Sequence, residues 1–302
     1  MKTDGITITH PDKMMFFEAK ITKHEMVEYY QRIADYILPW IKKRPLTLKR
    51  FPHGIAENGF FNKHAPDYFP DFIERFTVPM EKKGSKMQMV GVNASRDLVY
   101  LAEQNTIELH MALSTIDTIK QPDQMIFDLD PSDDDFEKVR TIAFCLKTIF
   151  DQQNIPSFVK TTGSRGVHVH VPILIEKDFN EVKACAKQIA ELLHHTCPEL
   201  TTLEHRKEKR QNKVFIDYLR NEYAMTVTAP YALRAHANAP VATPIDWDEL
   251  QDKSLKPHSY HLKNIFQRLG QKPDPWAGFD QKKIPFKSLS QIDNGFARLK
   301  KR

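Results

Sequence analysis

The sequence predicts a mixed α/β fold, built as one compact unit with two lobes. Three observations lead to this prediction. Short apolar stretches typical of strands recur at 125–130, 156–160, 167–173 and 214–219. Other segments repeat apolar residues at helical spacing. No obvious linker divides the 302 residues, so we expect a single domain over 1–302.

In the N-terminal part, one amphipathic helix is expected over 22–40. Thr22 and Glu25 have the spacing of a capping box. The apolar residues that recur at helical spacing are Met26, Tyr29, Ile33, Tyr36, Ile37 and Trp40. Residues 46–51 favour a strand, and 98–109 favour a short helix followed by a strand.

In the central part, the strand at 125–130 ends at Pro131, and Ser132 is expected to cap the next helix. One face of that helix carries Phe136, Val139, Ile142, Leu146 and Ile149. A further helix is expected over 180–195 and a strand over 214–219. The last hundred residues carry many prolines and few clear periods.

Composition and charge narrow the function class. The formal net charge of +5 is a mild preference for polyanionic partners. No apolar run reaches the roughly 20 residues of a membrane span, and no signal peptide is evident, so we expect a cytoplasmic protein with no membrane partner. The three cysteines form no Cys-x-x-Cys pair. His194, His195 and Cys197 lie close together, but no second cluster completes a four-ligand zinc site.

Asp128 and Asp130 are the first candidates for chemistry. Residues two apart in a strand point to the same face, so both carboxylates project together while Phe127 and Leu129 face the core. Two adjacent carboxylates resist joint ionisation unless a cation lies between them. Magnesium and manganese prefer such oxygen ligands, and two ions can serve one site. The alternative is an acidic strand end at the surface.

A third carboxylate, Asp217, lies in an otherwise apolar strand. It needs a partner there, either a metal shared with Asp128 and Asp130 or a buried Arg. The acids at 133–135 suit the first turn of a helix instead. They do not form a calcium loop, because Asp133 stands where Gly is needed and Val139 where Glu is needed.

The TTGSRG loop at 161–166 has features of a phosphate-binding loop. Its glycines permit close backbone approach, and Arg165 offers a forked cation. Hydroxyls able to bond phosphate oxygens come from Thr161, Thr162 and Ser164. It is not a Walker loop, and an ordinary hairpin turn is the alternative. His168 and His170 follow on one face of the next strand, where either a ligand-binding or a structural role is open.

Aromatic and basic residues suggest contact with nucleic acid. Phe60 and Phe61 can stack on bases if exposed, or anchor the core if buried. His110 is ambiguous alone. The basic residues, which either line a phosphate-binding cleft or form a solvated face, are Lys49, Arg50, Arg206, Lys207, Lys209, Arg210 and Lys213.

Taken in order, seven stretches resemble the polymerase domain of bacterial ligase D, a member of the archaeo-eukaryotic primase superfamily. They cover nearly the whole chain, and together they are far more specific than any one alone. They are THPDKMMF (9–16), KRFPHGIAENGFFNKHAP (49–66), IELH (107–110), FDLDP (127–131), KTTGSRGVHVHVP (160–172), VFIDYLRN (214–221) and TAPYALRA (228–235).

The resemblance implies the primase core: an N-terminal α/β lobe packed on an RRM-like lobe, with the active site between them. It implies template-dependent nucleotide addition, with ribonucleotides preferred, to DNA ends or gaps in non-homologous end joining. The implied cofactors are two Mn²⁺ or Mg²⁺ ions. The implied partners are nucleoside triphosphates, DNA with gaps, breaks or 5′-phosphate ends, Ku and a separate ATP-dependent DNA ligase. The ligase and phosphoesterase modules are absent, so a stand-alone polymerase is expected.

The same resemblance implies roles for individual residues. The catalytic metal ligands would be Asp128, Asp130 and Asp217. The incoming nucleotide would be bound by Lys49, His110, Thr162, Ser164, Arg165, His168 and Arg234, with His110 near the sugar. The DNA would be contacted by Lys13, Lys23, Phe60, Phe61, Lys63 and Arg210. Of these residues, Phe60 and Phe61 would stack on or order the template, and Lys13 and Lys23 would bind the 5′-phosphate.

Some positions depart from the family pattern. Relatives commonly carry Ser and Lys at the positions of Thr162 and Arg165, and a Pro-Trp pair at 111–112. Two other function classes compete. A haloacid-dehalogenase-type phosphatase would use Asp128 as nucleophile, but Pro131 follows the second Asp where that family expects Gly. A non-catalytic nucleic-acid-binding module would leave three strand carboxylates without a role.

Overall fold

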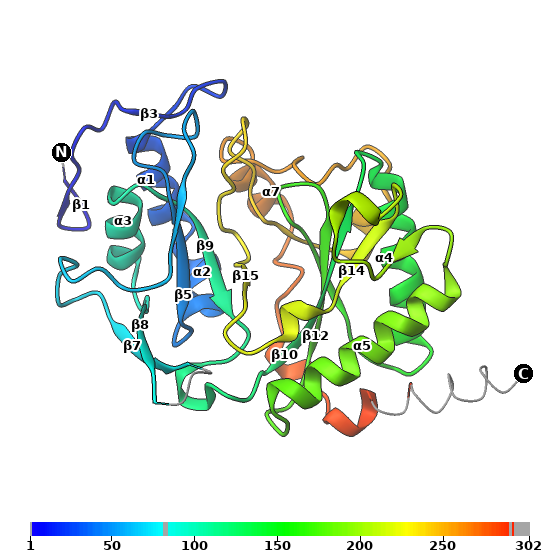
Figure 1. Cartoon of the computed structure of the whole chain (residues 1–302). Coiled ribbons are helices and arrows are strands. Elements are labelled where there is room, and N and C mark those ends of the chain that lie inside the picture. Colours follow the sequence, from blue (N-terminus) through cyan, green and yellow to red (C-terminus); the bar gives the residue numbers. More distant parts are fainter. Residues whose placement is uncertain (1, 81–83, 290–291, 293–302) are drawn as a thin grey trace, which may run out of the picture. The chain divides into compact units, whose positions relative to one another are not determined.

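The structure, a computed structural model, describes residues 2–80, 84–289 and 292, and the chain divides into two compact units (Figure 1). The first unit comprises Met1–Ile119, Thr226–Thr243 and His258–Lys272. The second comprises Lys120–Met225, Pro244–Pro257 and Pro273–Arg302. Each unit is therefore assembled from three separate stretches of sequence. The expectation of a single domain stays a prediction.

The first unit is built on a six-stranded antiparallel sheet. The main path is β15 (Thr226–Thr228), β9 (Thr106–Ala112), β5 (Leu46–Arg50), β8 (Lys86–Val90) and β7 (Arg75–Pro79), and β6 (Phe60–Asn62) pairs with β5. Because side chains alternate across a strand, one face carries Leu48 and Leu109 while the other carries Lys49, Glu108 and His110. The sequence predicted β5 and the helix and strand that end in β9.

Among the described residues, the first unit contains four α-helices: α1 (Lys23–Arg32), α2 (Ala34–Ile41), α3 (Ser95–Glu103) and α7 (Ile265–Gln271). The expected capping box of Thr22 and Glu25 is present at α1. The prediction of one helix over 22–40 is wrong, because the helix breaks at Ile33. Its ψ of −2° departs from the helical value, and its carbonyl accepts the amides of both Tyr36 and Ile37, which starts a second helix.

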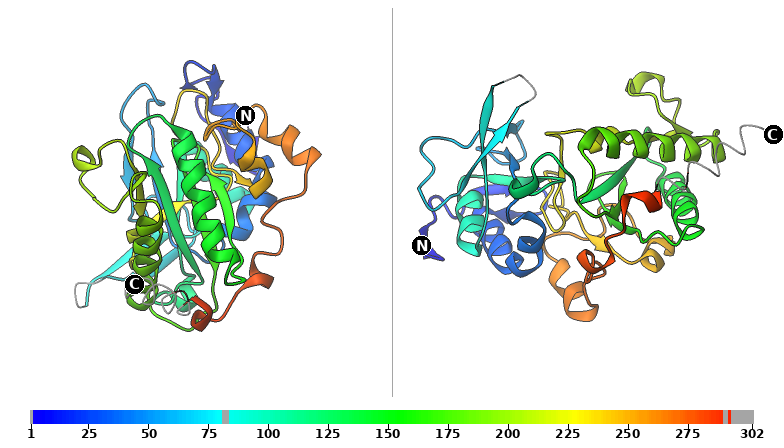
Figure 2. Two further views of the ribbon diagram at one scale, coloured as in Figure 1. Left: turned by 90° about the vertical axis from the view of Figure 1, so that its right-hand side faces the viewer. Right: turned by 90° about the horizontal axis from the view of Figure 1, so that it is seen from below.

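The second unit contains another six-stranded sheet. Its order is β13 (Thr201–Thr202), β14 (Val214–Asp217), β10 (Gln124–Pro131), β12 (Val167–Pro172), β11 (Phe158–Thr161) and β16 (Pro244–Ile245). Only the β13–β14 pair in it is parallel. The helices α4 (Phe136–Asp151) and α5 (Phe179–Thr196) contact each other and β10, and they run along one side of the sheet (Figure 2). That side buries Phe127 and Leu129 completely.

The capping prediction for α4 is wrong. Asp135 is the N-cap, and its carboxylate accepts the amide of Glu137. The Ser132 hydroxyl instead donates to the Lys213 carbonyl, because the chain must first turn away from β10 beside the end of β14. On the buried face of α4, Phe150 takes the position expected for Ile149, which is half-buried. The helix α5 matches the expected range within one residue at each end.

The remaining elements are short. They are β1 (Lys2–Thr3), β2 (Ile6–Thr7), β3 (Met14–Phe16), β4 (Ile21–Thr22), α6 (Trp247–Gln251) and the 3₁₀ turns η1 (Ile116–Thr118), η2 (Lys207–Lys209), η3 (Leu219–Asn221) and η4 (Asp280–Lys282). Within the described part of the chain, every helix falls short of the length and apolar content that crossing a membrane requires.

The loop between β11 and β12 depends on Gly166. A Cβ at this position would run into the carbonyl oxygen of Leu129 on β10, one residue before Asp130. Gly270, in α7, has open space where its Cβ would be. We therefore predict that Gly166→Ala lowers the free energy of unfolding by about 1–3 kcal/mol, since the backbone itself must shift.

Gly270→Ala is the matched control. It is expected to raise the free energy of unfolding by up to about 1 kcal/mol, because alanine favours a helix over glycine. Urea unfolding followed by circular dichroism measures both changes. Equal stability of Gly166→Ala and the unsubstituted chain would show that the loop does not need this close approach.

Candidate active site

The second unit brings together the three carboxylates that the sequence singled out. Strand register places Asp217 of β14 directly opposite Asp128 of β10. Asp130 lies two residues further along β10, so it projects from the same face. The structure therefore gathers Asp128, Asp130 and Asp217 on the face of the sheet opposite to the buried Phe127 and Leu129.

Arginine side chains neutralise this carboxylate cluster. The Nε of Arg220 lies 3.4 Å from Asp128 Oδ2 and 3.1 Å from Asp217 Oδ2, so one guanidinium bridges two carboxylates. Arg165 lies 3.1 Å from Asp130 Oδ2, and Arg210 lies 4.0 Å from the same oxygen. Among the described residues, no three Asp, Glu, His or Cys side chains have the spacing of a finished metal site. A cation nevertheless already bridges Asp128 and Asp217.

Burial disfavours the ionised form of two carboxylates in this cluster. It raises the pKa of Asp130, and the neighbouring Asp128 charge raises it further while Arg165 opposes the shift. It also raises the pKa of Asp217, where Arg220 opposes it. Close carboxylates that resist ionisation need compensating positive charge. Oxygen donors of this kind suit magnesium or manganese, so the donor set fits the expected cofactor.

The two histidines of β12 have different surroundings. The Nε2 of His168 lies 3.4 Å from Asp128 Oδ1, so His168 belongs to the carboxylate cluster. His170 is fully buried, and its Nδ1 lies 2.8 Å from Gln124 Oε1. The structural interpretation therefore holds for His170, while His168 borders the candidate site.

The TTGSRG loop is the hairpin connection between β11 and β12. The Thr162 hydroxyl donates to the Gly166 carbonyl and accepts the amides of Ser164 and Gly166, so this side chain shapes the loop from inside. Gly163 has a φ of +66°, which glycine adopts without strain. Ser164 and Arg165 are partly exposed. The hairpin alternative is thus correct for topology, and phosphate binding by the loop stays a prediction.

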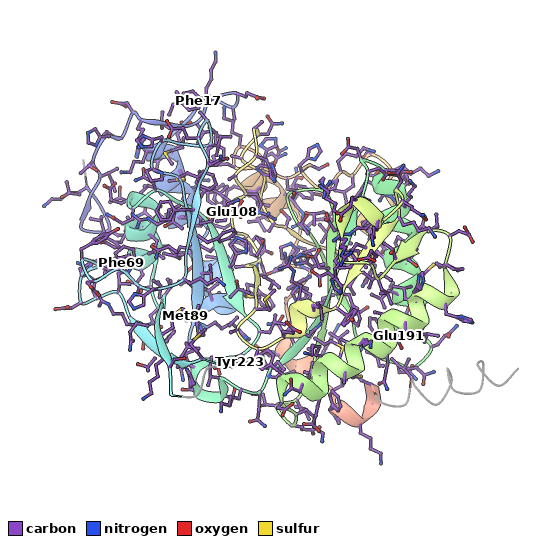
Figure 3. The ribbon with its side chains drawn as sticks, in the orientation of Figure 1. Phe17, Phe69, Met89, Glu108, Glu191 and Tyr223 are labelled. Carbon is purple, nitrogen blue, oxygen red and sulfur yellow. The ribbon has the colours of Figure 1, made fainter. Side chains whose placement is uncertain are left out.

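A second polar cluster lies in the first unit. Register aligns Phe61 of β6, Lys49 of β5 and Glu108 of β9 in one row across the sheet. His110 lies on the same face as Glu108, two residues further along β9, and the Nε of Arg234 lies 3.4 Å from Glu108 Oε2. Three predicted nucleotide-binding residues, Lys49, His110 and Arg234, therefore surround one carboxylate, which Figure 3 labels.

Glu108 was missed in the sequence analysis. Its side chain is only 2% exposed, yet it stays ionised. Burial alone would raise its pKa, but the hydrogen bond from His110 and the charge of Arg234 hold the pKa well below its ordinary value. The available signal was its spacing, because a residue two before His110 in a strand must share its face. Arg220 was likewise missed, three residues after Asp217.

The aromatic pair is exposed. Phe60 and Phe61 are 47% and 58% accessible, so the alternative that they anchor the core is wrong. The Phe61 ring lies 5.7 Å from the His110 ring, and the Lys49 ammonium lies 5.4 Å from the Phe61 ring centroid. Lys63 follows β6 and is exposed as well. This edge of the first unit is open to a stacking partner.

Other predicted DNA contacts are more enclosed. Lys23 is buried, and its Nζ lies 2.9 Å from Glu103 Oε2. The Nζ of Lys13 donates to the Pro52 carbonyl. Arg210 stacks 3.9 Å from the Phe215 ring centroid and donates to backbone carbonyls, at the border of the carboxylate cluster. Their contact with DNA stays a prediction.

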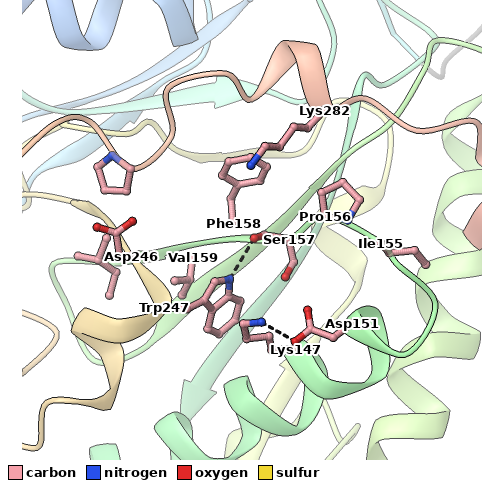
Figure 4. A pocket seen from close by; sticks show the side chains of 12 residues that line it. Lys147, Asp151, Ile155, Pro156, Ser157, Phe158, Val159, Asp246, Trp247 and Lys282 are labelled. Atoms are coloured by element: carbon pink, nitrogen blue, oxygen red, sulfur yellow. Dashed lines mark hydrogen bonds and ion pairs between the residues drawn. The ribbon is translucent and has the colours of Figure 1, made fainter.

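Two features of the second unit lie outside this set of residues. A cavity of about 290 Å³ is lined by residues that include Lys147, Phe158, Trp247 and Lys282, but by none of the predicted site residues (Figure 4). The Cys197 thiol lies 3.2 Å from the Cys145 sulfur, and His194 Nδ1 lies 2.8 Å from Thr201 Oγ1. The partners of Cys197 and His194 in these two contacts are protein groups.

Comparison with known proteins places this chain in the primase-polymerase class. The family model described as "LigD, primase-polymerase domain" matches residues 22–276. The chain belongs to this family, which confirms the resemblance seen in the sequence and replaces the phosphatase alternative.

Individual relatives agree. The chain is 33% identical over 276 residues to the bifunctional non-homologous end joining protein LigD of Bacillus subtilis, covering 91% of this chain and 44% of that protein. It is 31% identical to the multifunctional LigD of Mycolicibacterium smegmatis, covering 92% of this chain and 36% of that protein. The chain thus spans less than half the length of these curated relatives.

A solved structure of the polymerase domain from Mycobacterium tuberculosis ligase D, in complex with DNA, matches with a TM-score of 0.84 and 25% identity. The match covers 92% of this chain and 99% of that one. The expected α/β fold of the ligase D polymerase domain is therefore confirmed.

The charge state of Glu108 generates a prediction on stability. A carboxylate whose pKa is depressed by folding stabilises the protein above its unfolded pKa, near 4.5, and this contribution is lost as the pH falls. Glu108→Gln should therefore lower the free energy of unfolding at pH 7 by about 1–3 kcal/mol. The difference from the unsubstituted chain should shrink below pH 4.5. Urea unfolding at pH 7 and at pH 3.5 measures it, and a difference that does not change with pH would contradict the ionised state.

Proposed function

We propose that this chain is a template-dependent nucleotidyltransferase that adds nucleotides, preferring ribonucleotides, to DNA ends or gaps in non-homologous end joining. The observation that carries the proposal is the convergence of Asp128, Asp130 and Asp217 on one sheet face. Family membership supports it, and the names of the relatives point to this repair process.

The proposed cofactors are two Mn²⁺ or Mg²⁺ ions held by the three carboxylates. Bound there, such ions activate an attacking hydroxyl and stabilise a leaving pyrophosphate. Two features support this assignment: the oxygen donors, and the Arg220 guanidinium that already bridges Asp128 and Asp217 as a cation. Arg165 and Arg210, both beside Asp130, would then bind phosphate oxygens of the substrates, since guanidinium groups suit them.

Three residues of the polar cluster in the first unit are proposed to bind the incoming nucleotide. Lys49 and Arg234 supply positive charge for the triphosphate, and His110 supplies a polar contact for the sugar. In the second unit, Arg165 and His168 are proposed to bind nucleotide phosphates, and Thr162 shapes the loop that carries Ser164 and Arg165. Each role is the one that the resemblance to the ligase D polymerase domain implies.

The DNA is proposed to contact the exposed edge formed by Phe60, Phe61 and Lys63, because exposed aromatic rings stack on bases and lysines pair with phosphates. Arg210 would add a contact beside Asp130. Lys13 and Lys23 are proposed to bind a 5′-phosphate. Ku and a separate ATP-dependent DNA ligase are proposed partners, and the bacterial cytoplasm, at the nucleoid, is the proposed location.

Primer extension tests the proposed activity. We predict that the chain extends a primed template with Mn²⁺ and uses ribonucleotides better than deoxynucleotides. Asp130→Asn and Asp217→Asn should each reduce the rate by on the order of a thousandfold, because each removes a charge that holds the ions. Gel analysis of extension measures the rate, and fluorescence anisotropy verifies that DNA binding is retained.

The matched control for this experiment is Asp134→Asn, a neighbouring exposed carboxylate. Its rate should equal that of the unsubstituted chain. If the unsubstituted chain binds DNA but never extends it, the non-catalytic binding module is the better description. Extension that survives Asp217→Asn would remove this residue from the cluster's chemistry.

Binding to gapped DNA tests the proposed 5′-phosphate contact. Lys13→Ala should weaken binding roughly tenfold when the 5′-phosphate is present and much less when it is absent, because only then is a charge-assisted hydrogen bond lost. Lys13 is the sharper probe, since removing Lys23 would leave the buried Glu103 without its ion pair. Lys2→Ala, at an exposed position of β1, is the control. Equal weakening on both DNAs would refute the assignment.

A further inference from the structure

Glu108 occupies the centre of the polar cluster in the first unit. Its Oε2 lies 2.9 Å from His110 Nε2 and 3.4 Å from Arg234 Nε. Its Oε1 accepts the amide of Ala235 at 3.0 Å and lies 3.7 Å from Lys49 Nζ. One nearly inaccessible carboxylate thus holds three side chains and the backbone segment that carries Arg234.

These contacts fix the protonation pattern of His110. An ionised carboxylate only accepts hydrogen bonds, so the Nε2 of His110 must carry the proton that is donated to Glu108. Burial lowers the pKa of His110, and the positive charges of Arg234 and Lys49 lower it further against the effect of Glu108. The imidazole is therefore neutral near pH 7, and its Nδ1 carries a lone pair.

The Nδ1 of His110 is the atom left for a ligand. No described residue forms a hydrogen bond with it, and the side chain is 13% exposed beside the Phe61 ring. A lone pair at this position accepts a hydroxyl hydrogen, such as one from a sugar. With the other tautomer, the same atom would be a donor and would present the opposite preference.

We propose that Glu108 is a positioning residue: it fixes His110 with Nε2–H turned inward and Nδ1 presented as an acceptor for a hydroxyl of the nucleotide, and it holds Lys49 and Arg234 beside it. This inference rests on the proposed nucleotide-binding role of the cluster. In this proposal Glu108 contacts no substrate, but it determines which atoms of His110, Lys49 and Arg234 can bind one.

Charge and geometry together favour this role over a purely structural one. Without Glu108, the cations of Lys49 and Arg234 would repel each other beside His110. A glutamine at 108 would keep the volume but would turn an NH₂ group toward donors on one side. When that NH₂ group faces His110, the Nε2–H of His110 loses its fixed acceptor; in the other orientation, the amide of Ala235 loses its own.

The first test is nitrogen-15 NMR of the His110 ring, which needs neither nucleotide nor activity. In the unsubstituted chain, Nδ1 should show the shift of an unprotonated ring nitrogen and Nε2 that of a protonated one. Glu108→Gln should turn this single tautomer into a mixture. A protonated Nδ1 in the unsubstituted chain would overturn the inference at once, even if Glu108→Gln failed to fold.

The second test is kinetic. In primer extension with Mn²⁺, Glu108→Gln should raise the KM for the nucleotide roughly tenfold or more, with a smaller change in kcat. His110→Gln should raise the KM similarly, and the double variant should raise it by less than the product of the two single effects, because part of the effect of Glu108 passes through His110 and the rest through Lys49 and Arg234. Fully additive effects would contradict this coupling.

Asp97→Asn is the matched control, since Asp97 is also a buried carboxylate of the first unit, engaged only in capping α3. It should lower stability without changing the KM. An equal rise in KM would reduce the effect of Glu108 to general destabilisation. If the unsubstituted chain shows no extension, the proposed function fails while the NMR result still decides the tautomer. If it extends normally and Glu108→Gln changes neither readout, only the inference on Glu108 fails.

Discussion

The candidate site depends on positive charge that offsets three carboxylates, which strand pairing places side by side. Antiparallel pairing of β10 with β14 sets Asp128 against Asp217, and the two-residue period of the strand adds Asp130 to the same face. Burial raises the pKa of Asp130 and of Asp217, so ionised carboxylates here need positive charge close by. Arginines supply it in the described structure, and under the proposed function divalent ions would supply it when bound.

The first unit has the opposite arrangement of charge. There the sheet brings cations and an imidazole together, and a single buried carboxylate keeps them ordered. Glu108 is ionised because its neighbours outweigh its burial, whereas Asp130 and Asp217 are harder to ionise because burial and like charge act together. The two clusters therefore differ in chemistry: the second unit presents carboxylate oxygens held by arginines, and the first presents cations and an imidazole held by one carboxylate.

Apolar patterning was enough to predict β5, β9, β10, β11, β12 and β14, and the two-residue period of a strand predicted the shared face of Asp128 and Asp130, because these follow from local geometry. It was not enough for features set by packing between distant segments. The helix break at Ile33 and the cap at Asp135 depend on how the chain turns against its neighbours. The inward hydroxyl of Thr162 likewise needed coordinates, because nothing local says which way a loop side chain points.

Ion pairs between distant residues were the feature that the sequence predicted least well. Glu108 lies in the stretch IELH, which resembles the ligase D polymerase family. Its ion pairs form only because β5 and the segment after β15 lie beside β9 in the fold. Lys23 shows the same limit. This lysine was expected to contact a phosphate, but it is buried in an ion pair with Glu103, whose carboxylate also accepts a hydrogen bond from the distant Thr9. Such pairs require knowledge of strand register and helix packing.

The most direct measurement is anomalous X-ray diffraction from crystals of the chain soaked with Mn²⁺. The account predicts manganese peaks within bonding distance of Asp128, Asp130 and Asp217, with the Arg220 guanidinium displaced from its bridge. Manganese bound only elsewhere, with Arg220 still joining Asp128 and Asp217 at saturating metal, would contradict it.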